Sequence, residues 1–388
     1  EWLADGWRST PDRLRAWAQL ALRAAVLQEQ RLDERPLPDQ ALSTARSESA
    51  AELLCAELEV EGLPIDEAEV GRILASIVGE RPTTWADEEA KRQQRDAAVV
   101  SLLEPPLDVN LRNPGEVKAM LRRVGVDVPD TRAWRLEQLR DVHPVVDALL
   151  GWRKAERIAT TYGYRWLDEH VRNGRLLGEW TSSDGAAGRM TASAGLHNLP
   201  AEMRSAVAAD GGHMFVRADL GQIEPRVLAA VSGDAALVEA TLDADLYQPV
   251  ARRLGVARDI AKIAVLGAMY GSTTGESAHA LRGLQGSYPT AMAFLEAAAA
   301  EGSVGNDVMT VGGRRVRMWV DESVAGNIDR ARAVAAARGR FARNAVIQGA
   351  AAEFFKVWAI IVRRRCRALA AIVLETYRTL HGGLEGPR

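Results

Sequence analysis

Strand-like segments are rare in this sequence, and their scarcity restricts the chain to folds in which helices dominate. The expected strands are 176–180, 214–218 and 371–374, with a hairpin at 308–315. Apolar residues recur at helical spacing through most of the remainder, over 1–32, 45–77, 85–103, 114–124, 134–150, 144–172, 235–300 and 327–365. Isolated strands among long helices predict an α+β fold that is mostly helical.

Length and composition limit the class of protein. With 388 residues the chain is too long for one core, so two or three structural units are expected. We find no run of 18 apolar residues that could span a bilayer, and the first residues lack a basic start and an apolar core. Cys55 and Cys366 are too far apart in sequence to suggest a metal knuckle. We therefore expect a cytoplasmic protein with no membrane partner.

Charge does not decide whether the partner is a nucleic acid. The formal net charge is −3, yet between Arg314 and Arg343 eight arginines accompany only three acidic residues. Arginine suits bidentate contact with phosphate. A solvated helix face explains the same composition equally well.

Two carboxylates flank the point where an expected strand turns into a helix. Asp219 follows the strand 214–218, and Glu224 falls in the first turn of a helix that begins at about Ile223. A carboxylate at a strand end is held rigidly and can bind a divalent cation, while Glu224 suits a helix N-terminus. Taken alone, Asp219 is better interpreted as an exposed turn residue. The next segment reverses that preference.

Four residues spaced four apart share one face of the helix expected over 258–271. They are Arg258, Lys262, Leu266 and Tyr270. Each step adds about 40° of rotation, so the four spread over about 120°. The face presents two cations, an apolar position and then an aromatic ring, an order along which a triphosphate, a sugar and a base could lie. An amphipathic helix with a basic surface end is the alternative.

Both segments resemble motifs of family A DNA polymerases of the bacterial DNA polymerase I type. Asp219-Leu-Gly-Gln-Ile-Glu224 resembles motif A, and Arg258-Asp-Ile-Ala-Lys262 through Tyr270-Gly271 resembles motif B, the fingers helix. Other stretches match in order: 188–191 and 196–200 entering the palm, 340–351 in the template-contacting helix, and 59–66, 110–114 and 144–172 in the thumb. The resemblance covers roughly residues 45–370, and the amino-acid sequences of both motifs are similar to those of actinobacterial members.

The resemblance implies a monomer with a right-hand polymerase fold of thumb, palm and fingers. The expected parts are 1–44, the tail of an exonuclease-like domain and a linker; 45–174, the thumb and the start of the palm; 175–234, the palm with motif A; 235–305, the fingers with motif B; and 306–388, the C-terminal palm with an incomplete motif C. We find no Asp-x-Glu pair for metal-dependent editing before residue 45. We therefore expect no proofreading.

The same resemblance implies template-directed transfer of deoxynucleotides from their triphosphates to a primer 3′-hydroxyl on primer–template DNA, in replication or repair. Two Mg2+ ions, with Mn2+ as a substitute, would be bound by Asp219 and the Leu220 carbonyl. Asp219, Arg258 and Lys262 would be the catalytic residues. The nucleotide would contact Arg258, Lys262, Leu266, Tyr270, Glu224 and Gln222. The DNA would contact Arg189, Asn198, Arg340, Asn344 and Gln348.

Leu266 departs from the family pattern, which carries an aromatic residue that stacks near the incoming sugar and base. An aliphatic side chain keeps apolar contact but loses stacking, which is worth roughly 1–3 kcal/mol per base in single-strand binders. We expect weaker nucleotide affinity or altered sugar discrimination.

A second departure concerns the other metal-binding carboxylate, which the family carries in a His-Asp-Glu motif. Here the strand 371–374 is followed directly by Glu375, and no His-Asp occurs after Gln348. Three explanations are open: residues are missing between Leu374 and Glu375, which we favour; the motif is deleted and polymerisation is lost; or Glu375 replaces the ligand. Deletion would leave a catalytically impaired polymerase-fold protein that binds DNA. A single-subunit RNA polymerase is disfavoured by Gln222-Ile223-Glu224.

Overall fold

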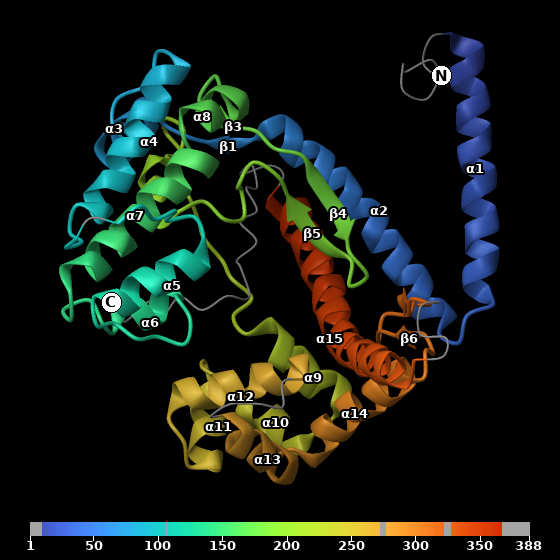
Figure 1. Cartoon of the computed structure of the whole chain (residues 1–388). Helices are drawn as coiled ribbons and strands as arrows, with labels where there is room; N and C mark the ends of the chain where they lie inside the picture. The colour runs from blue at the N-terminus through green and yellow to red at the C-terminus, as the bar shows by residue number, and fades with distance from the viewer. Residues whose placement is uncertain (1–9, 106, 272–276, 322–326, 367–388) are drawn as a thin grey trace. The chain divides into compact units, whose positions relative to one another are not determined.

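The computed structural model describes residues 10–105, 107–271, 277–321 and 327–366, and these residues are mainly helical with small sheets (Figure 1). The chain forms two compact units. Within the described ranges, the first unit comprises residues 10–56, 181–191 and 218–366, and the second comprises residues 57–180 and 192–217. The expected mostly helical class is confirmed. The finer division into thumb, palm and fingers stays a prediction.

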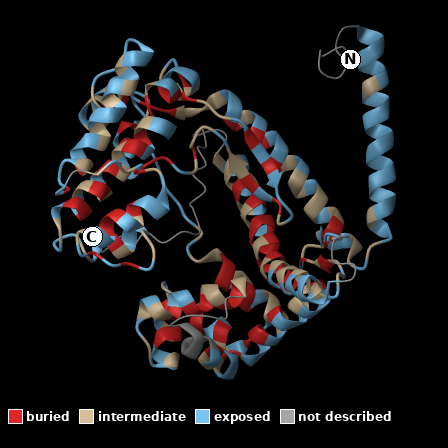
Figure 2. Ribbon diagram, viewed as in Figure 1, coloured by how far each residue is buried: buried red, intermediate tan, exposed pale blue. Residues whose placement is uncertain are grey.

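Two long helices open the described chain. α1 (Pro11–Asp33) begins with a proline in its first turn after Thr10, which caps the helix. α2 (Pro38–Glu61) follows the short break that the sequence predicts as a linker. No residue of α1 is buried, and Figure 2 shows the helix exposed along its length. The predicted N-terminal helix is confirmed over its described part, and residues 1–9 lie outside the described ranges.

The second unit is a helical layer with a small sheet. Its helices are α3 (Glu67–Val78), α4 (Trp85–Val100), α5 (Pro114–Arg123), α6 (Ala133–Glu137), α7 (Pro144–Thr161) and α8 (Tyr164–His170), with a short 3-10 helix, η3 (Ala201–Ala206). Antiparallel strands pair in the order β1 (Leu63–Pro64), β3 (Arg175–Leu176), β2 (Val171–Arg172). Fully buried side chains from α5 and α7 lie at the centre of its core, among them Val117, Leu121, Val145 and Leu149.

Two predicted helices of this unit are interrupted. The helix expected over 144–172 is broken at Tyr162, whose backbone leaves the helical conformation. The break places the Tyr162 hydroxyl where it donates to the Asn198 carbonyl at 2.9 Å, a tertiary contact that local periodicity does not reveal. The helix expected over 134–150 ends at Glu137, and a new helix starts at Pro144, which could not lie in the interior of one continuous helix.

The strand predictions have different outcomes in the structure. The hairpin of β6 (Val308–Met309) and β7 (Arg315–Val316) is confirmed, with Val308 opposite Val316. The apolar run at 176–180 holds the end of β3 and the start of β4 (Trp180–Asp184), which pairs with β5 (Arg189–Ala192).

The prediction of a strand at 214–218 is wrong. Its residues adopt no regular structure, and Met214 and Val216 are 83% and 87% exposed. A strand needs a neighbour to satisfy its N–H and C=O groups, and none pairs with this segment within the described ranges. The strand expected at 371–374 lies outside those ranges.

The first unit is built around α15 (Ile328–Cys366), the long helix predicted over 327–365. It packs against α14 (Pro289–Ser303), and α9 (Ile223–Ser232) and α12 (Arg258–Tyr270) also contact it. The same unit contains α10 (Ala235–Ala240), α11 (Tyr247–Leu254) and α13 (Ser277–Ser287). Close approach of α14 and α15 requires Gly302, where an added Cβ would lie 2.3 Å from the Cβ of Ala342.

α15 is also long and apolar enough to cross a membrane by length and composition. More than half of its most apolar stretch, however, is buried inside the protein. Figure 2 shows this buried central part. A core helix passes the same test, so the property is weak evidence for a membrane span.

Candidate nucleotide site

α12 exposes the face that the sequence predicts. Its buried side consists of Ala261, Ala264, Val265, Ala268 and Met269. On the opposite side Lys262 is exposed, whereas Arg258, Leu266 and Tyr270 are half-buried. Lys262 has no hydrogen-bond or ion-pair partner among the described residues. The predicted face therefore exists, with its ammonium group open to solvent.

Arg258 is already held by neighbouring groups. Its Nε donates to Asp245 Oδ2 at 2.6 Å, and a terminal nitrogen donates to Asp259 Oδ1 at 3.2 Å. The guanidinium carbon lies 5.6 Å from the ring centroid of Tyr247, within cation–π range. The hydrogen bond to Asp245 is the main cause that raises the pKa of Arg258.

Gln222 connects the start of α9 to the same carboxylate. Its Nε2 donates to Asp245 Oδ1 at 2.7 Å, and its Oε1 accepts from the Leu246 N–H at 2.8 Å. The backbone of Gln222 is left-handed, with φ 58° and ψ 39°, a conformation that costs a non-glycine residue roughly 1–2 kcal/mol. Because both ends of the amide are bonded, these contacts offset that cost and fix Gln222.

Arg226 organises the loop that carries Asp245. Its guanidinium donates to the carbonyls of Thr241 at 2.6 Å, Asp243 at 3.0 Å and Ala244 at 2.9 Å. Thr241 is the C-cap of α10, where carbonyls lack partners within the helix, and Asp243 and Ala244 follow in the loop. Arg226 supplies a donor to all three carbonyls. The segment that leads into Asp245 is therefore tied to α9.

Glu224, Tyr270 and Gln348 meet in a chain of hydrogen bonds. The Tyr270 hydroxyl donates to Glu224 Oε2 at 3.0 Å and accepts from Gln348 Nε2 at 3.1 Å. Glu224 is buried, and burial raises its pKa despite the hydrogen bond from Tyr270 and the positive charge of Arg189. Burial, followed by the Glu224 charge, also raises the pKa of Tyr270. α9, α12 and α15 are thus joined through polar groups beside the exposed face of α12.

The predicted metal ligands do not form a site by themselves. Asp219 is exposed and Leu220 is half-buried in the irregular segment before α9. Within the described part of the chain, no group of three or more His, Cys, Asp or Glu side chains could hold a metal ion. Glu375 lies outside that part. Among the described residues Asp219 supplies a single carboxylate, which is too few for the expected pair of ions, and the metal-binding role of Asp219 stays a prediction.

The predicted DNA contacts are distributed over both units. Arg189 on β5 and Arg340 on α15 are exposed in the first unit, and Asn198 is exposed in the second. Asn344 is half-buried, and its Oδ1 has no hydrogen-bond partner among the described residues. Gln348 instead bonds Tyr270, one turn of α15 beyond Asn344. All five DNA contacts stay predictions.

Two arginines of the basic segment are structural. Arg343 is buried, where it donates to the Ala268 carbonyl at 2.5 Å and to Glu296 at 2.6 Å. Arg314 is 17% exposed and bonds Glu48 at 2.5 Å. The arginine-rich stretch is therefore not one continuous phosphate-binding surface.

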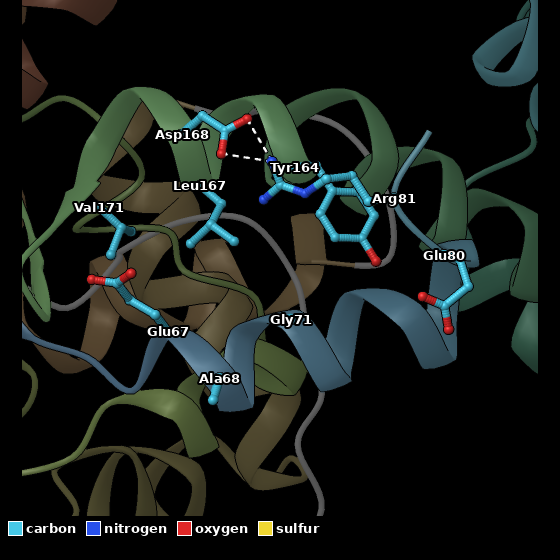
Figure 3. A pocket seen from close by; sticks show the side chains of 9 residues that line it. All are labelled: Glu67, Ala68, Gly71, Glu80, Arg81, Tyr164, Leu167, Asp168 and Val171. Atoms are coloured by element: carbon cyan, nitrogen blue, oxygen red, sulfur yellow. Dashed lines mark hydrogen bonds and ion pairs between the residues drawn. The ribbon is translucent and has the colours of Figure 1, made fainter. Parts of the chain in front are cut away.

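A cavity of about 670 Å³ lies within the second unit, and its lining carries more acidic than basic side chains (Figure 3). Its polar lining comprises Glu67, Glu80, Arg81, Tyr164 and Asp168. Arg81 donates to both oxygens of Asp168, at 2.8 and 2.9 Å. Three carboxylates against one paired arginine do not suit a triphosphate. The cavity does not compete with α12 as a nucleotide site.

Comparison with solved structures defines the class of fold. The POL domain of Pol1 from M. smegmatis, in complex with DNA primer-template and dNTP, matches with a TM-score of 0.63. The match covers 83% of this chain and 60% of that one at 24% identity, so it shows the fold alone. The fold of the chain is therefore that of a polymerase domain.

Sequence comparison then identifies the family. DNA polymerase family A matches residues 109–376, and the chain belongs to this family. A thermostable DNA polymerase I of Thermus thermophilus is 28% identical over 92% of this chain and 46% of its own length. The corresponding enzyme of Thermus aquaticus is 31% identical over 63% of this chain and 32% of its own length. DNA polymerase I of Chloroflexus aurantiacus is 31% identical over 60% of this chain and 27% of its own length. The chain spans less than half the length of these relatives.

Asp245 and Tyr247 take part in this region although the sequence did not point to them, and Arg343 was noted only as one arginine of the basic segment. Asp245 lies two residues before the first residue of α11, a position where carboxylates often accept backbone N–H groups. That signal could have suggested a fixed carboxylate but not its contact with Arg258. We found no local signal for the burial of Arg343.

Proposed function

We propose that the chain is a template-directed DNA polymerase region that adds deoxynucleotides to a primer 3′-end. The observation that carries the proposal is the exposed face of α12, on which Arg258, Lys262, Leu266 and Tyr270 follow one another beside buried Glu224. This order matches a nucleotide in the order phosphates, sugar and base. Family membership supports the same function, as does the primer-template and dNTP bound by the M. smegmatis domain.

Lys262 and Arg258 would bind the phosphates of the incoming nucleotide. Because Lys262 is exposed and unpaired in the described structure, its ammonium group can reach a ligand without losing an ion pair. It could also donate a proton to the departing pyrophosphate. Arg258 would add hydrogen bonds from its terminal nitrogens.

Glu224 and Tyr270 would form the floor beneath the sugar. Their hydrogen bond fixes the ring and the carboxylate against each other. A sugar seated on this pair would have little room for a 2′-hydroxyl, which accounts for selection of deoxynucleotides. Leu266, half-buried one turn earlier, would offer apolar contact without aromatic stacking.

Family A polymerases use divalent metal ions, and we propose two Mg2+ ions here, with Mn2+ as a substitute. One carboxylate cannot clamp two cations, and the described residues offer no complete site. We further propose that the protein acts as a cytoplasmic monomer in replication or repair.

A second candidate function is DNA binding by a catalytically impaired polymerase fold. The absence of a carboxylate cluster among the described residues favours it. Both candidates predict primer–template binding that weakens steeply with salt. Only the polymerase lengthens the primer.

Primer extension measured together with DNA affinity tests the proposal. We expect magnesium-dependent extension and, for Lys262→Met, a rate lower by roughly 100-fold with nearly unchanged primer–template affinity. Salt-sensitive binding without extension would instead establish the second candidate. Extension with ribonucleotides as fast as with deoxynucleotides would contradict the proposed sugar selection.

A further inference from the structure

The Asp245 carboxylate is held in place by residues other than Arg258. Its Oδ1 accepts from Gln222 Nε2 at 2.7 Å and from the Tyr247 N–H at 3.2 Å. Its Oδ2 is thereby directed at Arg258 Nε, 2.6 Å away. Although burial opposes ionisation, the hydrogen bonds from Arg258, Gln222 and the Tyr247 N–H lower the pKa of Asp245. Asp245 therefore presents a stable negative charge to the arginine.

Contact through Nε leaves the outer edge of the guanidinium available. Arginine has five N–H donors in a planar fork. Asp245 takes the one on Nε and Asp259 takes one on a terminal nitrogen, so three have no partner among the described residues. The Arg258 side chain is 38% exposed, and the Tyr247 ring supports it from one side. The arginine is thus oriented while its terminal nitrogens can still reach a ligand.

The two carboxylates on Arg258 differ in how easily a ligand displaces them. Asp259 is 62% exposed and holds a single 3.2 Å contact, and exposed ion pairs of this kind contribute little. Asp245 is 29% exposed and has two other hydrogen-bond donors. A phosphate would therefore replace Asp259 on the arginine and leave Asp245 in place.

We propose that Asp245 is a positioning residue that orients Arg258 toward the nucleotide phosphates and links it to Gln222 at the start of α9. The inference rests on the proposed function, because it takes Arg258 as a phosphate-binding group. Asp245 itself would not contact the nucleotide. Figure 1 shows that α11, whose first turn follows Asp245, lies beside α12.

Equilibrium nucleotide binding without catalysis tests the inference. The full chain is bound to a primer–template whose primer ends in a dideoxynucleotide, and affinity for the complementary deoxynucleoside triphosphate is measured. Asp245→Asn keeps the shape of the side chain but removes its charge, and we expect the Kd to rise roughly tenfold, which corresponds to about 1.4 kcal/mol. Asp259→Asn removes the same charge from the same arginine, and we expect a rise of less than about threefold.

Variants of Arg258 separate positioning from general damage. In an Arg258→Ala background, Asp245→Asn should not change the Kd further, since Asp245 acts through the arginine. Arg258→Lys keeps the charge but loses the planar fork, so it should weaken binding even if Asp245→Asn fails to fold. Equal or tighter nucleotide binding by folded Asp245→Asn would overturn the inference.

The proposed function and the inference fail in different ways. If Arg258→Ala leaves the Kd unchanged, Arg258 does not bind the nucleotide and the assigned site is wrong. If Arg258→Ala weakens binding but Asp245→Asn does not, the site stands and the positioning role is wrong. If Asp259→Asn weakens binding as much as Asp245→Asn, loss of charge alone explains both, and positioning is again wrong.

Discussion

The hydroxyl of Tyr270 donates a hydrogen bond to buried Glu224 across 3.0 Å, joining the C-terminal end of α12 to the first turn of α9. Gln348 of α15 donates to the same hydroxyl. One phenol therefore satisfies a buried carboxylate and connects three helices that are far apart in sequence. Its loss should affect both stability and the shape of the sugar site.

Replacing Tyr270 by phenylalanine should destabilise the protein by about 1–3 kcal/mol, because a buried carboxylate loses its donor. Urea unfolding measures the change. Tyr288→Phe is the matched control: Tyr288 is 2% exposed, and its hydroxyl has no hydrogen-bond partner in the described structure. The control should stay within about 0.5 kcal/mol of the parent, and equal losses in both variants would argue against the special role of Tyr270.

The contribution of Glu224 to the unfolding free energy should fall as the pH rises. Burial raises its pKa above the ordinary value of 4.5, so the folded state binds more protons than the unfolded state between the two pKa values. Its stabilising contribution is complete below the ordinary pKa and is lost as pH rises through the folded pKa. Relative to the parent, Glu224→Gln should therefore gain unfolding free energy as pH rises. A difference that is constant across a pH series of urea titrations would refute this.

Leu266→Phe should strengthen nucleotide binding. A ring at this half-buried position could stack on the sugar and base, with a gain of up to roughly 1–3 kcal/mol. The nucleotide Michaelis constant and the preference among sugar analogues are the measurements, and primer–template affinity should not change. If both nucleotide properties equal those of the parent, Leu266 does not face the nucleotide.

Arg343 should be more important for stability than its partner Glu296. Arg343→Met removes the short hydrogen bond to the Ala268 carbonyl near the end of α12 and leaves it only the 3.4 Å bond from the Gly271 N–H, so it should cost about 1–3 kcal/mol. Glu296 is 56% exposed, so Glu296→Gln should cost less than about 1 kcal/mol. Thermal or urea unfolding compares the two, and the reverse order would show that the ion pair rather than the carbonyl contact matters.

Local patterns predicted the helices that carry the candidate site. The four-residue spacing from Arg258 to Tyr270 indicated α12 because a helix face is a local property. The start of α9 at Ile223 followed from Glu224 and Pro225 in its first turn.

Features that depend on distant partners could not be predicted in this way. The strand at 214–218 was wrong because strands need neighbours, which apolar composition does not specify. Asp245 meets Gln222 and Arg258 only after the chain folds back. Arg343 resembles a surface arginine in sequence, whereas Glu296 and the Ala268 carbonyl make its burial tolerable.

Incorporation of a single nucleotide opposite each of the four template bases, with and without Asp219→Ala, tests template-directed polymerisation most directly. Asp141→Ala serves as the control, because Asp141 is exposed and has no partner among the described residues. We predict that the parent and the control add only the complementary deoxynucleotide when Mg2+ is present, and that Asp219→Ala adds none. No incorporation by a parent chain that binds primer–template, or incorporation that survives Asp219→Ala, would contradict the proposal.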